Sequence, residues 1–235
     1  MQTITKKTDA TLKIDVLAEL KYEPSVEVTD IGVLVKDGTV TLNGYVSSYV
    51  EKLEAVQAVK RIAGVKAIAD DIEIQLPASY HRTDSDIAAA ATNQINWATL
   101  IPPGTVRVTV RKGSITLEGE VEGWFQKNVA ANVVRHLLGV KGVSNLLSLA
   151  QPIRKNIDPP VKPVEVERAI KSAFKRSAVV DANQIRVETF GSNVELSGNV
   201  RNFAEREEAE RAAWAAPGVF SVDNQLTVKW FEFSQ

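Results

Sequence analysis

Hydrophobic residues near the start of the chain are spaced as they would be on one face of a helix. Leu12, Val16 and Leu20 lie four residues apart and form a stripe that can be buried. Thr8 or Asp9, just before this stripe, has the short polar side chain that helix N-caps favour. We therefore predict a helix that begins close to residue 9.

The residues that follow favour two strands, a second helix and a last strand. Apolar and polar residues alternate over 31–46 on both sides of Asp37-Gly38, which is typical of a β-hairpin. A second helix is predicted to begin near Ser47 and to end at Gly64, in the left-handed conformation that glycine adopts readily. Alternation over 68–76 predicts the last strand.

The same pattern occurs three times in the chain. Offsets of 75 and 154 residues align the apolar positions of all elements without gaps. Glycine recurs at the hairpin turn (Gly38, Gly113 and, displaced by one residue, Gly191), in the second hairpin strand (Gly44, Gly119 and Gly198) and at the end of the second helix (Gly64, Gly139 and Gly218). We interpret the strand glycines as clearance for a helix that packs closely on the sheet. The other two sets are interpreted as residues with positive φ.

The repeat predicts an α+β protein built from three tandem αββαβ modules. Each module is expected to be a two-layer sandwich, with a three-stranded sheet and two helices on one face. The expected boundaries are 8–76, 83–150 and 163–231, with linkers at 77–82 and 151–162. Pro152, Pro159 and Pro160 fall in the second linker, so we expect it to be extended.

Composition and charge narrow the possible functions. The 28 basic and 29 acidic residues give a net charge of −1, so we expect no nucleic-acid-binding surface. The sequence contains no cysteine, which excludes disulfides and thiolate metal sites. We see no apolar run long enough for a transmembrane segment and no secretory signal. The expected location is therefore cytoplasmic, or periplasmic if a signal has been removed.

Residue patterns typical of catalysis are missing from the sequence. His81 in the first linker and His136 on a helix are the two histidines, and neither recurs in the other copies. The glycines are spread one per turn instead of clustering in a phosphate-binding loop. The acidic groups Asp84-x-Asp86 and Asp70-Asp71-x-Glu73 do not recur as wholes, so helix capping and a solvated strand end explain them better than metal binding. We expect no enzyme active site, cofactor or metal, although a potassium site made of backbone carbonyls would leave no sequence pattern.

An aromatic residue lies at the start of each second helix. The candidate surface residues are Tyr49, Trp124 and Phe203, with Phe125 and Lys127 beside Trp124, and also Trp97, which precedes Ala-Thr-Leu-Ile-Pro-Pro. One interpretation is structural, with a hydrophobic staple at the helix entry and core packing for Trp97. The other is an interfacial anchor, in which aromatic tips and nearby basic side chains meet anionic headgroups.

The motifs together resemble the BON (bacterial OsmY and nodulation) domain family. The resemblance is based on V-x-V-x-x-G-x-V-x-L-x-G-x-V at 33–46, and on the Gly-Val pair whose glycine is followed six residues later by Asp70, Asn145 or Asn224. It covers nearly the whole chain, in three copies. It implies the αββαβ fold and a non-enzymatic role in envelope integrity or osmotic stress, with binding to phospholipid or another hydrophobic surface. Some cytoplasmic relatives bind potassium.

Two functions are compatible with this reading. The first is a non-catalytic stress-response protein, osmotic or envelope-related, whose modules bind phospholipid or another hydrophobic or anionic surface. The second is a cytoplasmic scaffold for protein–protein contacts, or a sensor of a small ligand or a potassium-like ion. Since the apolar frame recurs while the charged and aromatic residues do not, we expect function to depend on what differs between the copies.

Overall fold

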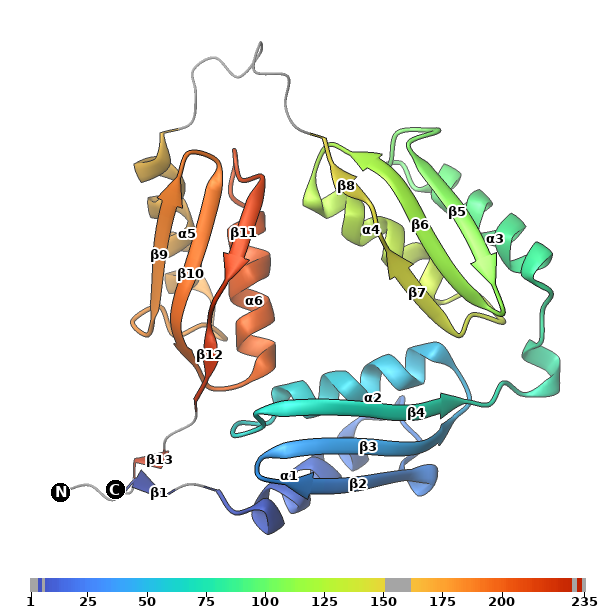
Figure 1. Ribbon diagram of the computed structural model, residues 1–235, viewed down its shortest axis with the longest axis horizontal. Coiled ribbons are helices and arrows are strands. Elements are labelled where there is room, and N and C mark those ends of the chain that lie inside the picture. Colours follow the sequence, from blue (N-terminus) through green and yellow to red (C-terminus); the bar gives the residue numbers. More distant parts are fainter. Residues whose placement is uncertain (1–3, 6, 151–161, 230–231, 234–235) are drawn as a thin grey trace. The chain divides into compact units, whose positions relative to one another are not determined.

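The computed structural model (Figure 1) describes residues 4–5, 7–150, 162–229 and 232–233. These residues form three successive modules with the order helix, strand, strand, helix, strand, which confirms the predicted α+β fold. Residues 151–161 of the predicted second linker lie outside the described residues, as do 230–231 at the predicted end of the third module.

The three modules have matching elements. Module 1 contains α1 (Asp9–Tyr22), β2 (Ile31–Lys36), β3 (Thr39–Val46), α2 (Tyr49–Arg61) and β4 (Ala67–Ile74). Module 2 contains α3 (Asp84–Trp97), β5 (Val106–Arg111), β6 (Ser114–Val121), α4 (Trp124–Arg135), β7 (Gly142–Asn145) and β8 (Ser148–Leu149). Module 3 contains α5 (Pro163–Arg176), β9 (Ile185–Phe190), β10 (Asn193–Val200), α6 (Phe203–Trp214), β11 (Ser221–Asn224) and β12 (Thr227–Val228). Short 3-10 turns, η1 (Val28–Asp30) and η2 (Ala78–Tyr80), precede β2 and α3, and β1 (Ile4–Thr5) pairs with β13 (Glu232–Phe233).

The second hairpin strand is the central strand of each module's sheet. It pairs antiparallel with the first hairpin strand, so that in module 2 Leu117 lies opposite Val108. In modules 2 and 3 its other edge pairs with the last strand in parallel. A parallel neighbour requires a crossover connection, and the second helix of the module supplies it.

The last strand is interrupted in modules 2 and 3 by a turn at an asparagine. Asn145 Oδ1 accepts a hydrogen bond from the Leu147 N–H at 3.3 Å, and its Nδ2 donates to the Lys127 carbonyl on α4 at 2.6 Å. Asn224 accepts in the same way from the Leu226 N–H at 3.2 Å. These bonds satisfy backbone groups where the ladder stops, which explains the polar residue six positions after the helix-ending glycine.

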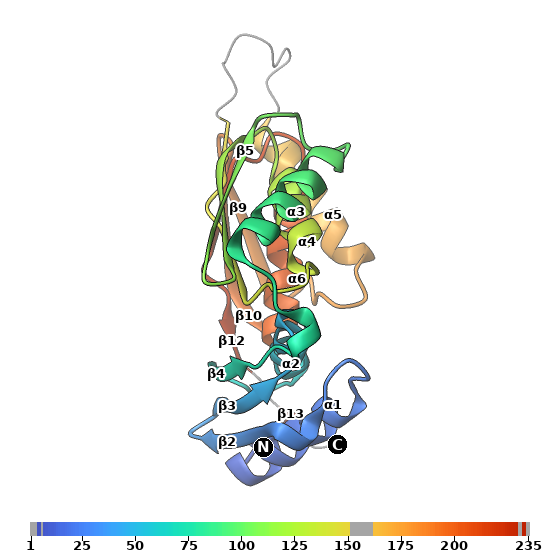
Figure 2. The same ribbon diagram turned by 90° about the vertical axis from the view of Figure 1, so that its right-hand side faces the viewer.

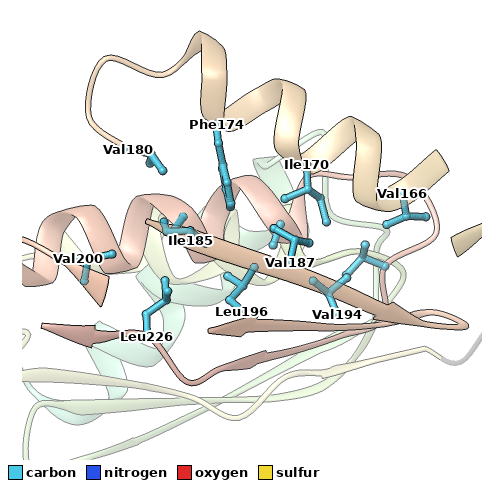
Figure 3. Close-up of a cluster of buried hydrophobic side chains, with 13 residues drawn as sticks. Val166, Ile170, Phe174, Val180, Ile185, Val187, Val194, Leu196, Val200 and Leu226 are labelled. Carbon is cyan, nitrogen blue, oxygen red and sulfur yellow. The ribbon is translucent and has the colours of Figure 1, made fainter. Parts of the chain in front are cut away.

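Both helices of a module cover the same face of its sheet. In module 3, seen from the side in Figure 2, β9 and β10 lie on one side and α5 and α6 on the other. Figure 3 shows Ile170 and Phe174 of α5 directed toward Val187 and Leu196 on the strands, and all four side chains are buried. Burial of this apolar stripe is the main stabilising term of each module.

The first turn of α3 holds the hairpin turn of its own module. Thr83 is the N-cap of α3, and the next residue, Asp84, accepts hydrogen bonds from the N–H groups of Lys112 and Gly113 at 2.7 and 2.8 Å. Both turn residues have positive φ, 51° and 79°, as in a type I′ turn. Asp9 holds the turn of module 1 in the same way.

Module 3 departs from this arrangement because Pro163 stands in the place of Asp9 and Asp84. Its hairpin turn has one residue with positive φ, Gly191 at 64°, followed by Ser192. A glycine at the first central position is typical of a type II′ turn, which explains why the turn glycine is displaced by one residue.

The glycine of the central strand clears a backbone carbonyl, which corrects the prediction that it clears a helix. A Cβ atom added at Gly119, where φ is 136°, would lie 2.0 Å from the carbonyl oxygen of Thr105, just before β5. A Cβ atom added at Gly44 or Gly198 would likewise lie 1.9 or 2.2 Å from the carbonyl oxygen of the residue just before the first hairpin strand of its module. The close approach is therefore internal to the hairpin.

We expect Gly119→Val to destabilise module 2 by on the order of 3 kcal/mol, because valine combines an unfavourable positive φ with a clash against backbone. Urea unfolding followed by tryptophan fluorescence measures the change. Gly142→Ala is the matched control, since Gly142 lacks a positive φ and a Cβ there would approach Ser114 Oγ at 3.4 Å. An unchanged unfolding midpoint for Gly119→Val would contradict this account.

Candidate functional site

A buried polar side chain stands near the start of each second helix. Among the described residues, the polar or charged side chains that are buried are Glu51, Gln126 and Glu205, which occupy equivalent positions in the three modules. Gln126 Oε1 accepts hydrogen bonds from the N–H groups of Glu122 and Gly123 at 2.8 and 3.2 Å. This side chain therefore fixes the turn between the central strand and the helix.

The Glu205 carboxylate accepts three hydrogen bonds. Its Oε2 accepts from the backbone N–H and the Nε of Arg201 at 2.8 and 3.0 Å, and its Oε1 accepts from the Asp181 N–H at 2.7 Å. Because glutamine does the same work in module 2, the role is structural. Sequence reasoning missed this residue, although an acid or amide at the same place in all three copies was a usable signal.

The residues considered for catalysis or metal binding lie apart from one another or belong to turns. His81 is exposed in the first linker, with its ring nitrogen 3.0 Å from the Leu76 carbonyl oxygen, and His136 is exposed after α4. Asp86 accepts hydrogen bonds from the side chain and backbone of Thr83, which lower its pKa. Within the described residues, no three histidine, aspartate or glutamate side chains form a group suited to a metal ion.

The candidate surface residues divide into exposed and half-buried groups. The side chains of Trp97 and Phe125 are 78% and 52% exposed, so the core-packing interpretation of Trp97 is wrong. Trp124, Lys127 and Phe203 are half-buried. Trp124 and Phe203 are the first residues of their helices, one position inside the N-cap, whereas a hydrophobic staple uses the residue before the N-cap. The staple interpretation is therefore also wrong for these two residues.

Tyr49 has a different environment from its counterparts. It is the first residue of α2, yet it is half-buried and packs against the apolar core of module 2. The segment Tyr45–Leu53 belongs to one compact unit with Glu73–Asn156. Tyr49 thus links consecutive modules, and its ring is partly withdrawn from the surface.

Trp97 and Phe125 come from the same end of module 2. Trp97 is the last residue of α3, and the following loop leads into β5, whose first residue, Val106, lies opposite Gly119 near the end of β6. Helix α4 begins shortly after β6, so the end of α3 and the start of α4 lie at the same end of the sheet (Figure 1). Leu100, in the loop, is 54% exposed. We call Trp97, Leu100 and Phe125 the apolar end.

The surroundings of the apolar end carry few charges. Residues 87–106, which include most of α3 and the loop after it, contain no charged side chain. The corresponding helices of the other modules expose basic residues, such as Lys13 on α1 and Lys171 on α5. Close to the apolar end, Arg107 is exposed at the start of β5 and Lys127 lies in the first turn of α4. Acidic residues lie at this end too, since Glu118 pairs with Arg107 and both Glu120 and Glu122 are exposed.

None of the helices described by the structure has both the length and the hydrophobicity required to cross a bilayer. Three large apolar side chains exposed at one end of a module make that end a candidate interaction surface.

Comparison with known proteins gives one family and one curated relative. A sequence profile of the BON domain matches residues 8–75, 83–151 and 164–229. The chain is similar to osmotically-inducible protein Y of Escherichia coli (strain K12), with 28% identity over 141 residues, which cover 58% of this chain and 70% of that protein.

Solved structures add little to this comparison. CdsD, a structural protein of the type III secretion system of Chlamydia trachomatis, matches with a TM-score of 0.27 and 13% identity, over 92% of this chain and 91% of that chain. The PrgH periplasmic domain matches with a TM-score of 0.22 and 11% identity, over 92% of this chain and all of that chain, 100%. Such low TM-scores carry no argument about fold or function.

We expect Glu205→Gln to lower the free energy of unfolding of module 3 by about 1–3 kcal/mol, because the amide NH₂ would face a backbone N–H donor. Urea unfolding followed by tryptophan fluorescence tests this expectation. Glu195→Gln, the same change on the outer face of β10, serves as the control. Equal stability of the two variants would show that the Glu205 contacts are dispensable.

Proposed function

This chain belongs to the BON domain family, and from that membership we propose a non-catalytic protein of the osmotic or envelope stress response that binds phospholipid surfaces through module 2. Its similarity to osmotically-inducible protein Y supports the stress-response role. The exposure of Trp97, Leu100 and Phe125 at the same end of module 2 is the observation that carries the choice of module and surface.

The apolar end has the chemistry of a peripheral membrane anchor. Indole rings suit the boundary between headgroups and hydrocarbon, because the ring is apolar while its N–H can still reach water. The uncharged stretch 87–106 avoids the cost of bringing ions close to hydrocarbon. Lys127, in the first turn of α4 beside Phe125, supplies a positive charge that can meet an anionic headgroup, whereas Arg107 lies opposite Glu118.

The corresponding positions in the other modules lack this combination. Trp97 is replaced by Tyr22 in module 1 and by Arg176 in module 3, and Phe125 is replaced by valine and alanine. Tyr22 is itself 85% exposed, but it lies between Lys21 and Glu23. Module 2 is therefore the module we expect to contact lipid.

We expect the full chain to co-sediment at low salt with vesicles of phosphatidylcholine and phosphatidylglycerol. The affinity of the variant Trp97→Ser/Phe125→Ser for the vesicles should fall by about tenfold or more, since the variant loses two large apolar side chains from the contact. Tyr22→Ser, at the equivalent exposed position of module 1, should bind like the unchanged chain. If the unchanged chain does not bind these vesicles, the lipid proposal is wrong, and if the double variant binds equally well, the apolar end is not the site.

A further inference from the structure

Helix α6 of module 3 meets helix α2 of module 1 end to end. Asn202 is the N-cap of α6, and its Oδ1 accepts a hydrogen bond from the Glu205 N–H at 2.8 Å. Its Nδ2 donates to the carbonyl of Arg61, the last residue of α2, also at 2.8 Å. Helix termini leave such N–H and carbonyl groups without partners inside the helix. One amide side chain thus satisfies the start of one helix and the end of another.

An ion pair lies next to this junction. Lys60 Nζ is 2.5 Å from Glu207 Oε1, so the basic end of α2 faces an acidic residue in the first turns of α6. The Arg61 side chain pairs with Glu19 of α1 and with Glu23, the C-cap of α1, at 2.6 and 3.0 Å. The helix dipoles add to the attraction, because the positive N-terminal end of α6 approaches the negative C-terminal end of α2.

The residues that module 3 contributes to this junction are specific to it. Asn202 corresponds to Ser48 and Gly123, and neither residue carries a side-chain amide. Glu207 corresponds to a leucine in module 1 and an asparagine in module 2. Among the three modules, the amide and the carboxylate that match the end of α2 therefore occur together in module 3 alone.

A second contact joins the same two modules. Strand β1, just before module 1, pairs antiparallel with β13, which follows module 3, so that Ile4 lies opposite Phe233 and Thr5 opposite Glu232. Most of module 1 and all of module 3 accordingly fall in one compact unit, Met1–Gly44, Glu54–Ile72 and Ile157–Gln235. Two separated parts of the chain thus bring the first and last modules together.

We propose that module 3 carries a docking surface for module 1 of the same chain, formed by Asn202 and Glu207 and received by Lys60 and the Arg61 carbonyl. The partner is thus an internal one, recognised by the exposed end of a helix and by opposite charge. The role proposed for module 3 is thus to bind module 1, and it does not depend on the lipid binding proposed for module 2.

Zero-length cross-linking with a carbodiimide tests this interface in the unmodified chain, because it joins lysine and carboxylate side chains that already touch. We expect mass spectrometry of the monomer band to show a Lys60–Glu207 link. Lys171 and Glu167, 2.5 Å apart on α5, provide an internal standard for the reaction. If the standard forms without the Lys60–Glu207 link, or if that link occurs only in cross-linked dimers, the proposal is wrong.

Asn202→Asp separates docking from capping. Aspartate keeps the side-chain oxygen that caps α6 but replaces the Nδ2 donor with a charge that faces the Arg61 carbonyl. We expect the yield of the Lys60–Glu207 link to fall by about fivefold or more, with the Lys171–Glu167 link and the circular dichroism spectrum unchanged. An unchanged yield of the Lys60–Glu207 link would overturn the role assigned to Asn202.

Discussion

The hairpin of every module depends on the close approach of its central-strand glycine to the carbonyl that precedes the first strand. A side chain at Gly119 would lie 2.0 Å from that oxygen, so the two strands can meet there only with glycine. The glycine pairs with Ile31, Val106 or Ile185 in the three modules, which gives all three hairpins the same register. Register decides which residues face the helices, so the position of the core follows from this contact.

The shared frame leaves the ends of the modules free to differ. The first helix of each module begins with aspartate in modules 1 and 2 and with Pro163 in module 3. It ends with Tyr22, Trp97 or Arg176. These positions lie outside the core, so they can differ between modules without changing its packing. The proposed lipid contact and the proposed docking contact both arise at these variable ends, from Trp97 in one module and from Asn202 in another.

Sequence periodicity was sufficient for the fold, since three copies of the same apolar spacing could be aligned without gaps. The same periodicity also indicates that Trp97 is exposed, although we favoured core packing for it. The buried stripe of α3 runs through Ile87, Ala91 and Ile95, and a residue two positions beyond Ile95 points away from that stripe. The contacts of Glu205 were beyond prediction, because its partner at Asp181 lies in a loop whose course depends on the packed module. The close contact that requires the strand glycines could not be predicted either, because its partner is a backbone carbonyl oxygen and not a side chain.

The central claim is that the apolar end of module 2 is the surface that enters a membrane interface. It is tested most directly with brominated phospholipids, which quench tryptophan fluorescence at short range. In a chain whose other tryptophans are changed to phenylalanine, we predict that Trp97 is quenched by brominated vesicles and shifts to shorter wavelength. A chain that retains Trp214 of module 3 alone should show neither effect. Quenching of Trp97 no stronger than that of Trp214 would contradict the account.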